Sequence, residues 1–107
     1  MNTFTDREKA FEAKFAQDSE VQFRVYARRN KILGLWAAEL LGKDGDEAEN
    51  YAKEVVKSDF EEPGDEDVFR KVRQDFDAKG IEQSDHQIRR TMEELMDTAI
   101  EQIKSEA

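Results

Sequence analysis

Apolar residues recur along this chain at spacings of three, four and seven, the period of an amphipathic helix. Glycines, a proline and capping residues divide the pattern into four segments, at about 19–41, 46–58, 65–79 and 85–105. No stretch alternates β-branched with polar residues, as a half-buried strand would. Four amphipathic helices with short connections predict an all-α fold, a small four-helix bundle formed by residues 19–107.

Each predicted helix has one apolar stripe that we expect to face the core. The stripes consist of Tyr26, Leu33, Trp36, Ala37 and Leu40; of Ala48, Tyr51, Ala52, Val55 and Val56; of Phe69, Val72 and Phe76; and of Ile88, Met92, Leu95, Met96, Ala99 and Ile103. Two helix starts carry the pattern of a capping box, Asp46 with Glu49 and Ser84 with Gln87. Gly42 follows the first helix, where a left-handed residue commonly ends a helix.

The N-terminal residues 1–18 do not continue the bundle pattern. Phe4, Phe11 and Phe15 lie seven and four residues apart and would share one narrow stripe of a helix. The next positions of that stripe are polar, namely Asp18, Ser19 and Gln22. A helix of fewer than ~15 residues is marginal in water, so we expect this segment to be mobile in the free protein and to fold on binding. The phenylalanines are either additional core for the bundle or anchors for a groove on another protein.

The counts of charged and sulfur-containing residues exclude several classes of function. The chain has 107 residues, 17 basic and 26 acidic side chains, a net charge of −9, one histidine and no cysteine. This length fits one domain, and the lack of cysteine excludes disulfides, thiolate catalysis and cysteine metal sites. The acidic balance disfavours nucleic acid as a partner. No apolar run approaches the ~20 residues that span a bilayer, so we expect a soluble, cytoplasmic protein with no membrane insertion.

Charge is distributed unevenly along the chain. Residues 19–43 contain five basic and two acidic side chains, whereas residues 44–67 contain two basic and eleven acidic ones. We interpret this contrast as attraction between the first helix and the acidic region, with an acidic docking surface for a basic partner as the alternative. The pairs Arg28-Arg29 and Arg89-Arg90 are interpreted as salt-bridged helix faces, with contact to a nucleotide phosphate as the alternative.

Motifs that would support catalysis or cofactor binding are missing. The sequence contains neither a G-x-x-x-x-G-K-[ST] loop nor a G-x-G-x-x-G turn. Asp44-Gly45-Asp46 resembles the start of a calcium loop, but the sixth position is Glu49 where that loop needs glycine. His86 falls in the first turn of the last predicted helix, where a solvated histidine is common. We therefore expect no catalytic residue, no metal and no cofactor, and we interpret the chain as a protein that is not an enzyme.

Several stretches, taken in this order and spacing, resemble the zeta subunit of alphaproteobacterial F-type ATP synthases. They are Arg7-Glu8, Glu12-Ala13-Lys14-Phe15-Ala16, Ala27-Arg28-Arg29-Asn30, Leu33-Gly34, Trp36-Ala37-Ala38, Leu41-Gly42 and Phe60-Glu61-Glu62-Pro63-Gly64-Asp65-Glu66-Asp67-Val68. The resemblance covers nearly the whole chain, is dense up to about Lys71 and is looser in the last helix. The proline-containing stretch is the most specific of these motifs.

The resemblance implies a four-helix bundle whose N-terminal segment inhibits ATP hydrolysis by the synthase. In that family the segment becomes helical in a cleft between catalytic and non-catalytic head subunits near the central shaft, and it blocks rotation. The matching positions in this chain are Phe4, Arg7, Glu8, Lys9, Phe11, Lys14 and Phe15. The protein would then be peripheral to the membrane-bound synthase, with the head subunits and the shaft as its partners.

A second reading of the resemblance concerns adenine nucleotides, which members of the family have been proposed to bind weakly. The chain would then be an acidic helical module that acts as a nucleotide sensor or regulator. Without a phosphate loop, such a site would be built from basic side chains on the bundle surface, such as Arg28, Arg29 or Arg70.

Overall fold

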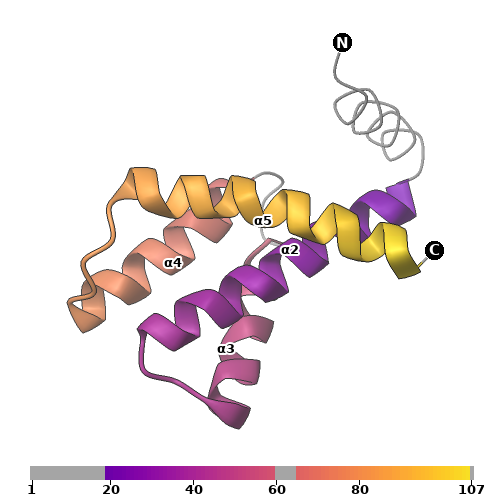
Figure 1. Ribbon diagram of the computed structural model, residues 1–107. Coiled ribbons are helices and arrows are strands. Elements are labelled where there is room, and N and C mark those ends of the chain that lie inside the picture. The colour runs from indigo at the N-terminus through magenta and orange to yellow at the C-terminus, as the bar shows by residue number, and fades with distance from the viewer. Residues whose placement is uncertain (1–18, 60–64, 107) are drawn as a thin grey trace.

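The computed structural model describes residues 19–59 and 65–106. They form four helices: α2 (Ser19–Leu40), α3 (Gly45–Ser58), α4 (Glu66–Lys79) and α5 (Asp85–Glu106) (Figure 1). No strand occurs in this part of the chain, so the predicted all-α fold is confirmed. Each predicted helix end lies within one residue of the observed one. None of the described helices is long and apolar enough to cross a membrane.

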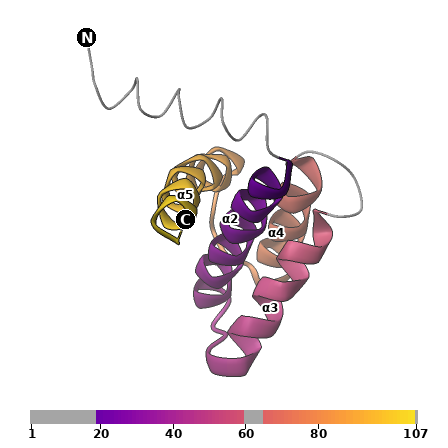
Figure 2. The same ribbon diagram turned by 90° about the vertical axis from the view of Figure 1, so that its right-hand side faces the viewer.

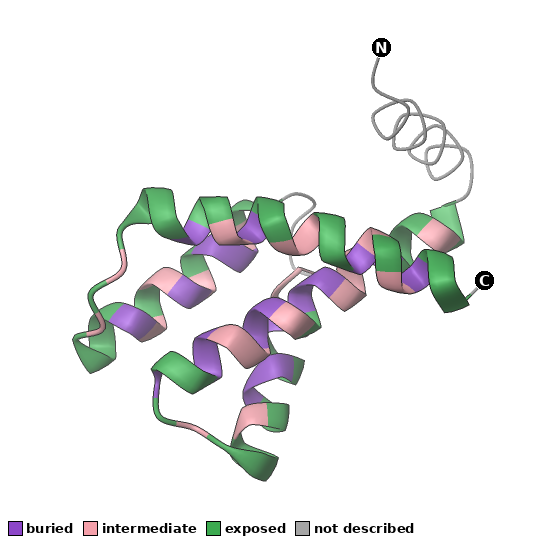
Figure 3. Ribbon diagram, viewed as in Figure 1, coloured by how far each residue is buried: buried purple, intermediate pink, exposed green. Residues whose placement is uncertain are grey.

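α2 is the central helix: α2 and α4 each contact the other three helices, but most of the contacts between helices involve α2. α3 packs along its C-terminal half and α5 crosses its other side, while α4 lies between α3 and α5 (Figures 1 and 2). Buried positions line the facing sides of the helices and exposed positions line their outer sides (Figure 3). The small four-helix bundle predicted from the apolar stripes is therefore the observed architecture.

The two predicted capping boxes have different outcomes. Ser84 and Gln87 form one, since the Gln87 backbone N–H donates to Ser84 Oγ at 3.1 Å and the Ser84 backbone N–H donates to Gln87 Oε1 at 2.8 Å. The box of Asp46 and Glu49 was wrong. α3 begins one residue earlier than predicted, its N-cap is Asp44, and Asp44 makes no side-chain capping bond.

The main core is one apolar cluster that draws on all four helices. Its buried residues are Leu33, Ala37, Ala38, Leu41, Tyr51, Val55, Val68, Phe69, Val72, Phe76, Ile88 and Met92. Trp36 packs against this cluster, with its ring edge-on to Phe76 at a centroid separation of 5.7 Å. α4 buries Val68 as well as the three residues of its predicted stripe, Phe69, Val72 and Phe76.

The predicted stripe of the first helix needs two corrections. Tyr26 was expected in the core but is only half-buried, and the Arg29 guanidinium lies 5.7 Å from its ring centroid. Leu40 was expected in the core but is 36% exposed, because it is the last residue of α2 and its neighbour Leu41 is buried instead. Val25 and Asn30 are buried on α2 although neither belonged to the predicted stripe. The inner face of α2 is therefore broader than the apolar pattern indicated.

The crossing of α2 and α3 depends on a glycine in the middle of α2. A Cβ at Gly34 would lie 2.6 Å from the Ala52 Cα and 3.3 Å from the Val55 Cβ. The first of these contacts is with backbone, which cannot rotate away. Gly34 therefore lets the two helices approach more closely than any other residue would allow.

Gly34→Ala should lower the free energy of unfolding by about 1–3 kcal/mol, because the new methyl group pushes α3 away from α2. This expected loss is net of the ~1 kcal/mol that alanine gains over glycine inside a helix. Urea unfolding followed by circular dichroism measures the difference. A midpoint equal to or above that of the wild type would contradict the close approach of the two helices.

Candidate functional site

Two polar residues are buried side by side in the middle of the inner face of α2. Arg29 is 1% exposed and Asn30 is fully buried. The Arg29 Nε–H donates to Asn30 Oδ1 at 2.7 Å, and the guanidinium Nη2 donates to Asp65 Oδ1 at 2.6 Å, just before α4. A buried guanidinium without such partners would be strongly destabilising. We call this arrangement the polar pair of α2.

The end of α3 also faces this polar pair. Burial raises the pKa of the Asp59 carboxyl above its usual range, and the nearby Asp65 and Asp67 raise it further. Asn30 and the charge of Arg29 oppose this rise. No described residue accepts a hydrogen bond of ordinary distance and angle from Asn30 Nδ2. The polar pair thus joins α2 to the end of α3 and to the start of α4.

Sequence reasoning placed Arg29 on a salt-bridged outer face and did not identify the polar pair. Arg29 lies four residues after Val25 and four before Leu33, and both of these are buried. This i±4 spacing was the available signal for burial. Arg28 does lie on an ion-paired face, as predicted.

A second apolar cluster lies beyond the polar pair, toward the start of α2. It contains the buried Val25, Ala99 and Ile103, with the half-buried Val21, Met96 and Ile100 against them. All six residues come from α2 and α5. We call the first turns of α2 and the last turns of α5, with this cluster between them, the α2–α5 arm.

Ion pairs close the outer end of the α2–α5 arm. Arg28 Nη2 lies 2.7 Å from Glu106 Oε1, and Arg24 Nη2 lies 3.5 Å from Glu106 Oε2. Arg28 Nη1 also donates to Gln102 Oε1 at 2.8 Å. Figures 1 and 2 show the last turn of α5 beside the first turns of α2. The arm therefore includes Ser19, the residue to which the N-terminal residues 1–18 are joined.

Among the residues that the structure describes, the predicted attraction between the first helix and the acidic region is seen in one ion pair. The Arg29–Asp65 ion pair joins α2 to this region, whereas Arg24 and Arg28 pair with Glu106 of α5. Of the basic residues in the first helix, it is the buried Arg29 that holds the acidic region against α2 in the described part of the chain.

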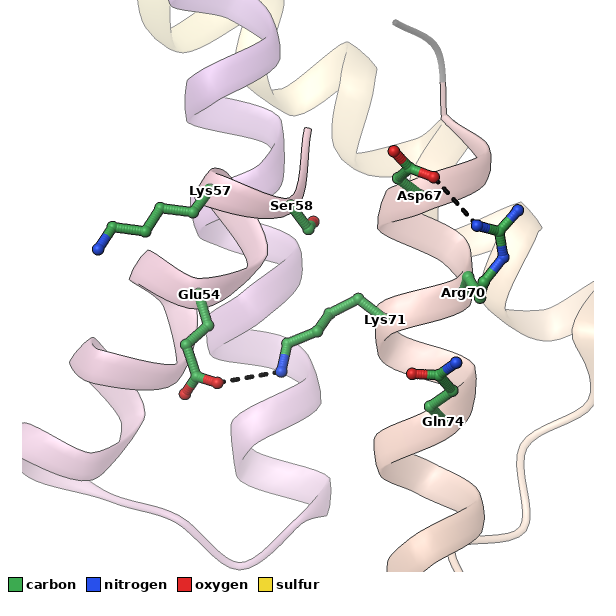
Figure 4. A pocket seen from close by; sticks show the side chains of 7 residues that line it. All are labelled: Glu54, Lys57, Ser58, Asp67, Arg70, Lys71 and Gln74. Atoms are coloured by element: carbon green, nitrogen blue, oxygen red, sulfur yellow. Dashed lines mark hydrogen bonds and ion pairs between the residues drawn. The ribbon is translucent and has the colours of Figure 1, made fainter. Parts of the chain in front are cut away.

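A polar groove of about 410 Å³ lies between α3 and α4 (Figure 4). It is lined by Glu54, Lys57, Ser58, Asp67, Arg70, Lys71 and Gln74. Lys71 bridges Glu54 at 3.0 Å and Asp75 at 2.9 Å. Burial lowers the pKa of the Lys71 ammonium, but the hydrogen bonds to Asp75 and Glu54 outweigh it and raise the pKa. Lys71 is therefore engaged within the bundle.

The remaining cations of the groove offer little to an anionic ligand. Arg70 pairs with Asp67 at 3.2 Å. Lys57 extends away from α4 in Figure 4. None of the described lining residues is aromatic, so this part of the chain offers an adenine ring no stacking surface in the groove.

The three arginines named as nucleotide contacts do not meet in one site. Arg70 lines the groove between α3 and α4, Arg28 belongs to the α2–α5 arm, and Arg29 is buried. Arg29 also lines a smaller cavity of about 220 Å³, which includes Asp65, Arg89, Met92, Glu93 and Met96. Weak nucleotide binding therefore stays a prediction.

The other candidate residues have simple surroundings or lie outside the described part of the chain. His86 is exposed in the first turn of α5. Within residues 19–59 and 65–106, no group of three histidine or acidic residues is placed to hold a metal ion. The seven predicted inhibitory residues, Phe4, Arg7, Glu8, Lys9, Phe11, Lys14 and Phe15, all precede the described residues.

Asp59→Asn should raise the melting temperature near neutral pH. The folded state raises the pKa of Asp59, so the ionised carboxylate lowers stability above that pKa, and this cost disappears as the pH falls. The gain should therefore be largest at about pH 7 and shrink toward about pH 4. Differential scanning calorimetry across this range measures it.

Asp97→Asn is the matched control, because Asp97 is exposed on α5 and makes no ion pair with a described residue. Its melting temperature should follow that of the wild type at every pH. If Asp59→Asn raised the melting temperature by the same amount at every pH, the raised pKa of Asp59 beside the polar pair would be contradicted.

Comparison with known proteins gives the family. The sequence model of "ATPase inhibitor subunit zeta" matches residues 1–102. A solved structure, described as a solution NMR structure, is 53% identical and superposes with a TM-score of 0.72, covering 80% of this chain and 98% of the other. No curated protein matches the chain. The protein belongs to the ATPase inhibitor subunit zeta family, whose role is regulatory rather than catalytic.

Proposed function

We propose that this protein inhibits the F-type ATP synthase by inserting residues 1–18 into a cleft of the catalytic head and stopping rotation. Phe4, Phe11 and Phe15 are the apolar anchors of this contact. The charged positions pair with polar groups of the cleft walls; they are Arg7, Glu8, Lys9 and Lys14. The head subunits and the central shaft are the partners.

The observation that carries the proposal is the extent of the family match. It begins at residue 1 and therefore includes the whole proposed inhibitory segment together with the bundle. Among the described residues, the two apolar clusters join α2 to α3, α4 and α5. The segment is joined to the outer end of the molecule, at the start of α2.

The energy available from such a contact is sufficient for inhibition. Burying one phenylalanine stabilises a complex by ~1.5–3 kcal/mol, so three anchors supply ~5–9 kcal/mol before the cost of ordering the segment. A segment that folds on binding loses part of this gain to ordering. The remainder still supports a specific complex, with the partner's apolar surface providing the burial.

Phe11→Ala with Phe15→Ala should weaken inhibition by at least about tenfold, because two of the three anchors are lost. The measurement is the ATP hydrolysis rate of the cognate synthase head, purified free of this protein and titrated with each variant. Circular dichroism should show a bundle as stable as that of the wild type.

Leu40→Ala is the control variant, because Leu40 is an exposed apolar side chain at the far end of α2. It should inhibit like the wild type. Full potency of the double phenylalanine variant would exclude the anchor role, and a wild-type chain without any inhibition would contradict the proposed function itself.

A further inference from the structure

The polar pair divides the inner face of α2 into two parts. Val21, Val25, Arg29 and Leu33 follow one another at intervals of four along this face. Val21 and Val25 belong to the arm cluster, and Leu33 belongs to the main core. The charged Arg29 stands between them. The apolar contacts of the arm and of the core are therefore not continuous along α2.

Among the described residues, the α2–α5 arm buries fewer and smaller apolar side chains than the main core. The largest fully buried apolar side chains are Phe76, Leu33, Ile88, Val55, Val68 and Val72, and every one belongs to the main core. The fully buried residue of the arm cluster is a small one, Ala99, and three of the six members are only half-buried. Regions with few buried apolar contacts open locally without global unfolding.

The ion pairs at the end of the arm add little to its stability. The Arg24 and Glu106 side chains are about half exposed, and exposed pairs contribute little net free energy. Glu106 also lies in the last turn of α5, where a negative charge is unfavourable beside the helix dipole. Its two arginine partners compensate for this position.

We propose that the α2–α5 arm opens independently of the main core, and that its opening exposes Val21 and Val25 as a second contact surface for the synthase head. The inference rests on the proposed function, because this surface extends the contact of residues 1–18. In a helical projection of the sequence, Val25 lies on the same side as Phe11 and Phe15.

Opening of the arm becomes favourable on binding because the synthase head replaces α5 as the partner of α2. In the closed arm, α5 covers Val21 and Val25. On the synthase, the head covers them instead, so the apolar area uncovered by opening is buried again. The last turns of α5 therefore compete with the head for the same face of α2, and the closed arm lowers the apparent affinity for the head.

Glu106→Gln tests the competition by weakening the closed arm. Removing the charge that pairs with Arg24 and Arg28 should raise the open population, and with it the inhibitory potency, by roughly threefold. Amide hydrogen exchange in the arm should accelerate by a similar factor, while exchange in the main core stays unchanged. Glu101→Gln is the matched control, since Glu101 is exposed on α5 and makes no ion pair with a described residue.

A reversible crosslink tests the same inference in the opposite direction. The chain has no cysteine, so Val25→Cys combined with Ala99→Cys or Ile103→Cys introduces one disulfide across the arm. The oxidised protein, with its arm locked, should inhibit at least about tenfold less than the same protein after reduction.

The outcomes separate this inference from the function on which it rests. Equal potency of the oxidised and reduced forms would overturn the second contact surface, and so would faster arm exchange in Glu106→Gln without a gain in potency over Glu101→Gln. Arm and core amides that exchange only together would overturn independent opening. A reduced protein and a wild type that both fail to inhibit would instead contradict the proposed function.

Discussion

The arrangement of this molecule depends on a charged side chain buried in its central helix. Arg29 has to be paired, because an isolated guanidinium in the interior would cost several kcal/mol. Its partners are Asn30 beside it and Asp65 at the start of α4. The need to satisfy Arg29 therefore fixes α4 against α2, and it separates the main core from the apolar cluster of the α2–α5 arm.

The two sides of the polar pair differ in the way they are packed. On one side, Gly34 permits the close crossing of α2 and α3, and large side chains such as Phe76 fill the space between four helices. On the other side, two helices share a small cluster and exposed ion pairs. This difference in packing fits the proposed inhibitor, in which residues 1–18 are joined to the arm and binding rearranges the arm without unfolding the core.

Much of the fold followed from the sequence, because the helical periodicity of small and apolar residues is strong from Leu33 onward. The helix bounds, the capping box of Ser84 and Gln87 and most of the core were predictable on this basis. The polar pair was not, since a charged residue is normally assigned to the surface and its partner Asp65 is 36 residues away. The capping box of Asp46 and Glu49 failed because the chain offered an alternative N-cap, Asp44, two residues earlier. For residues 1–18, three aromatic residues at helical spacing left additional core and a contact surface as alternatives, and only the family resemblance favoured a contact with the synthase head.

The central claim is that inhibition resides in residues 1–18 and stability in the bundle. The most direct measurement compares the full chain with a variant lacking residues 1–18, in both thermal unfolding and inhibition of ATP hydrolysis by the purified synthase head. Our account predicts nearly equal melting temperatures and no inhibition by the shortened chain. A large drop in melting temperature, which would make Phe4, Phe11 and Phe15 part of the core, or full inhibition by the shortened chain, would contradict it.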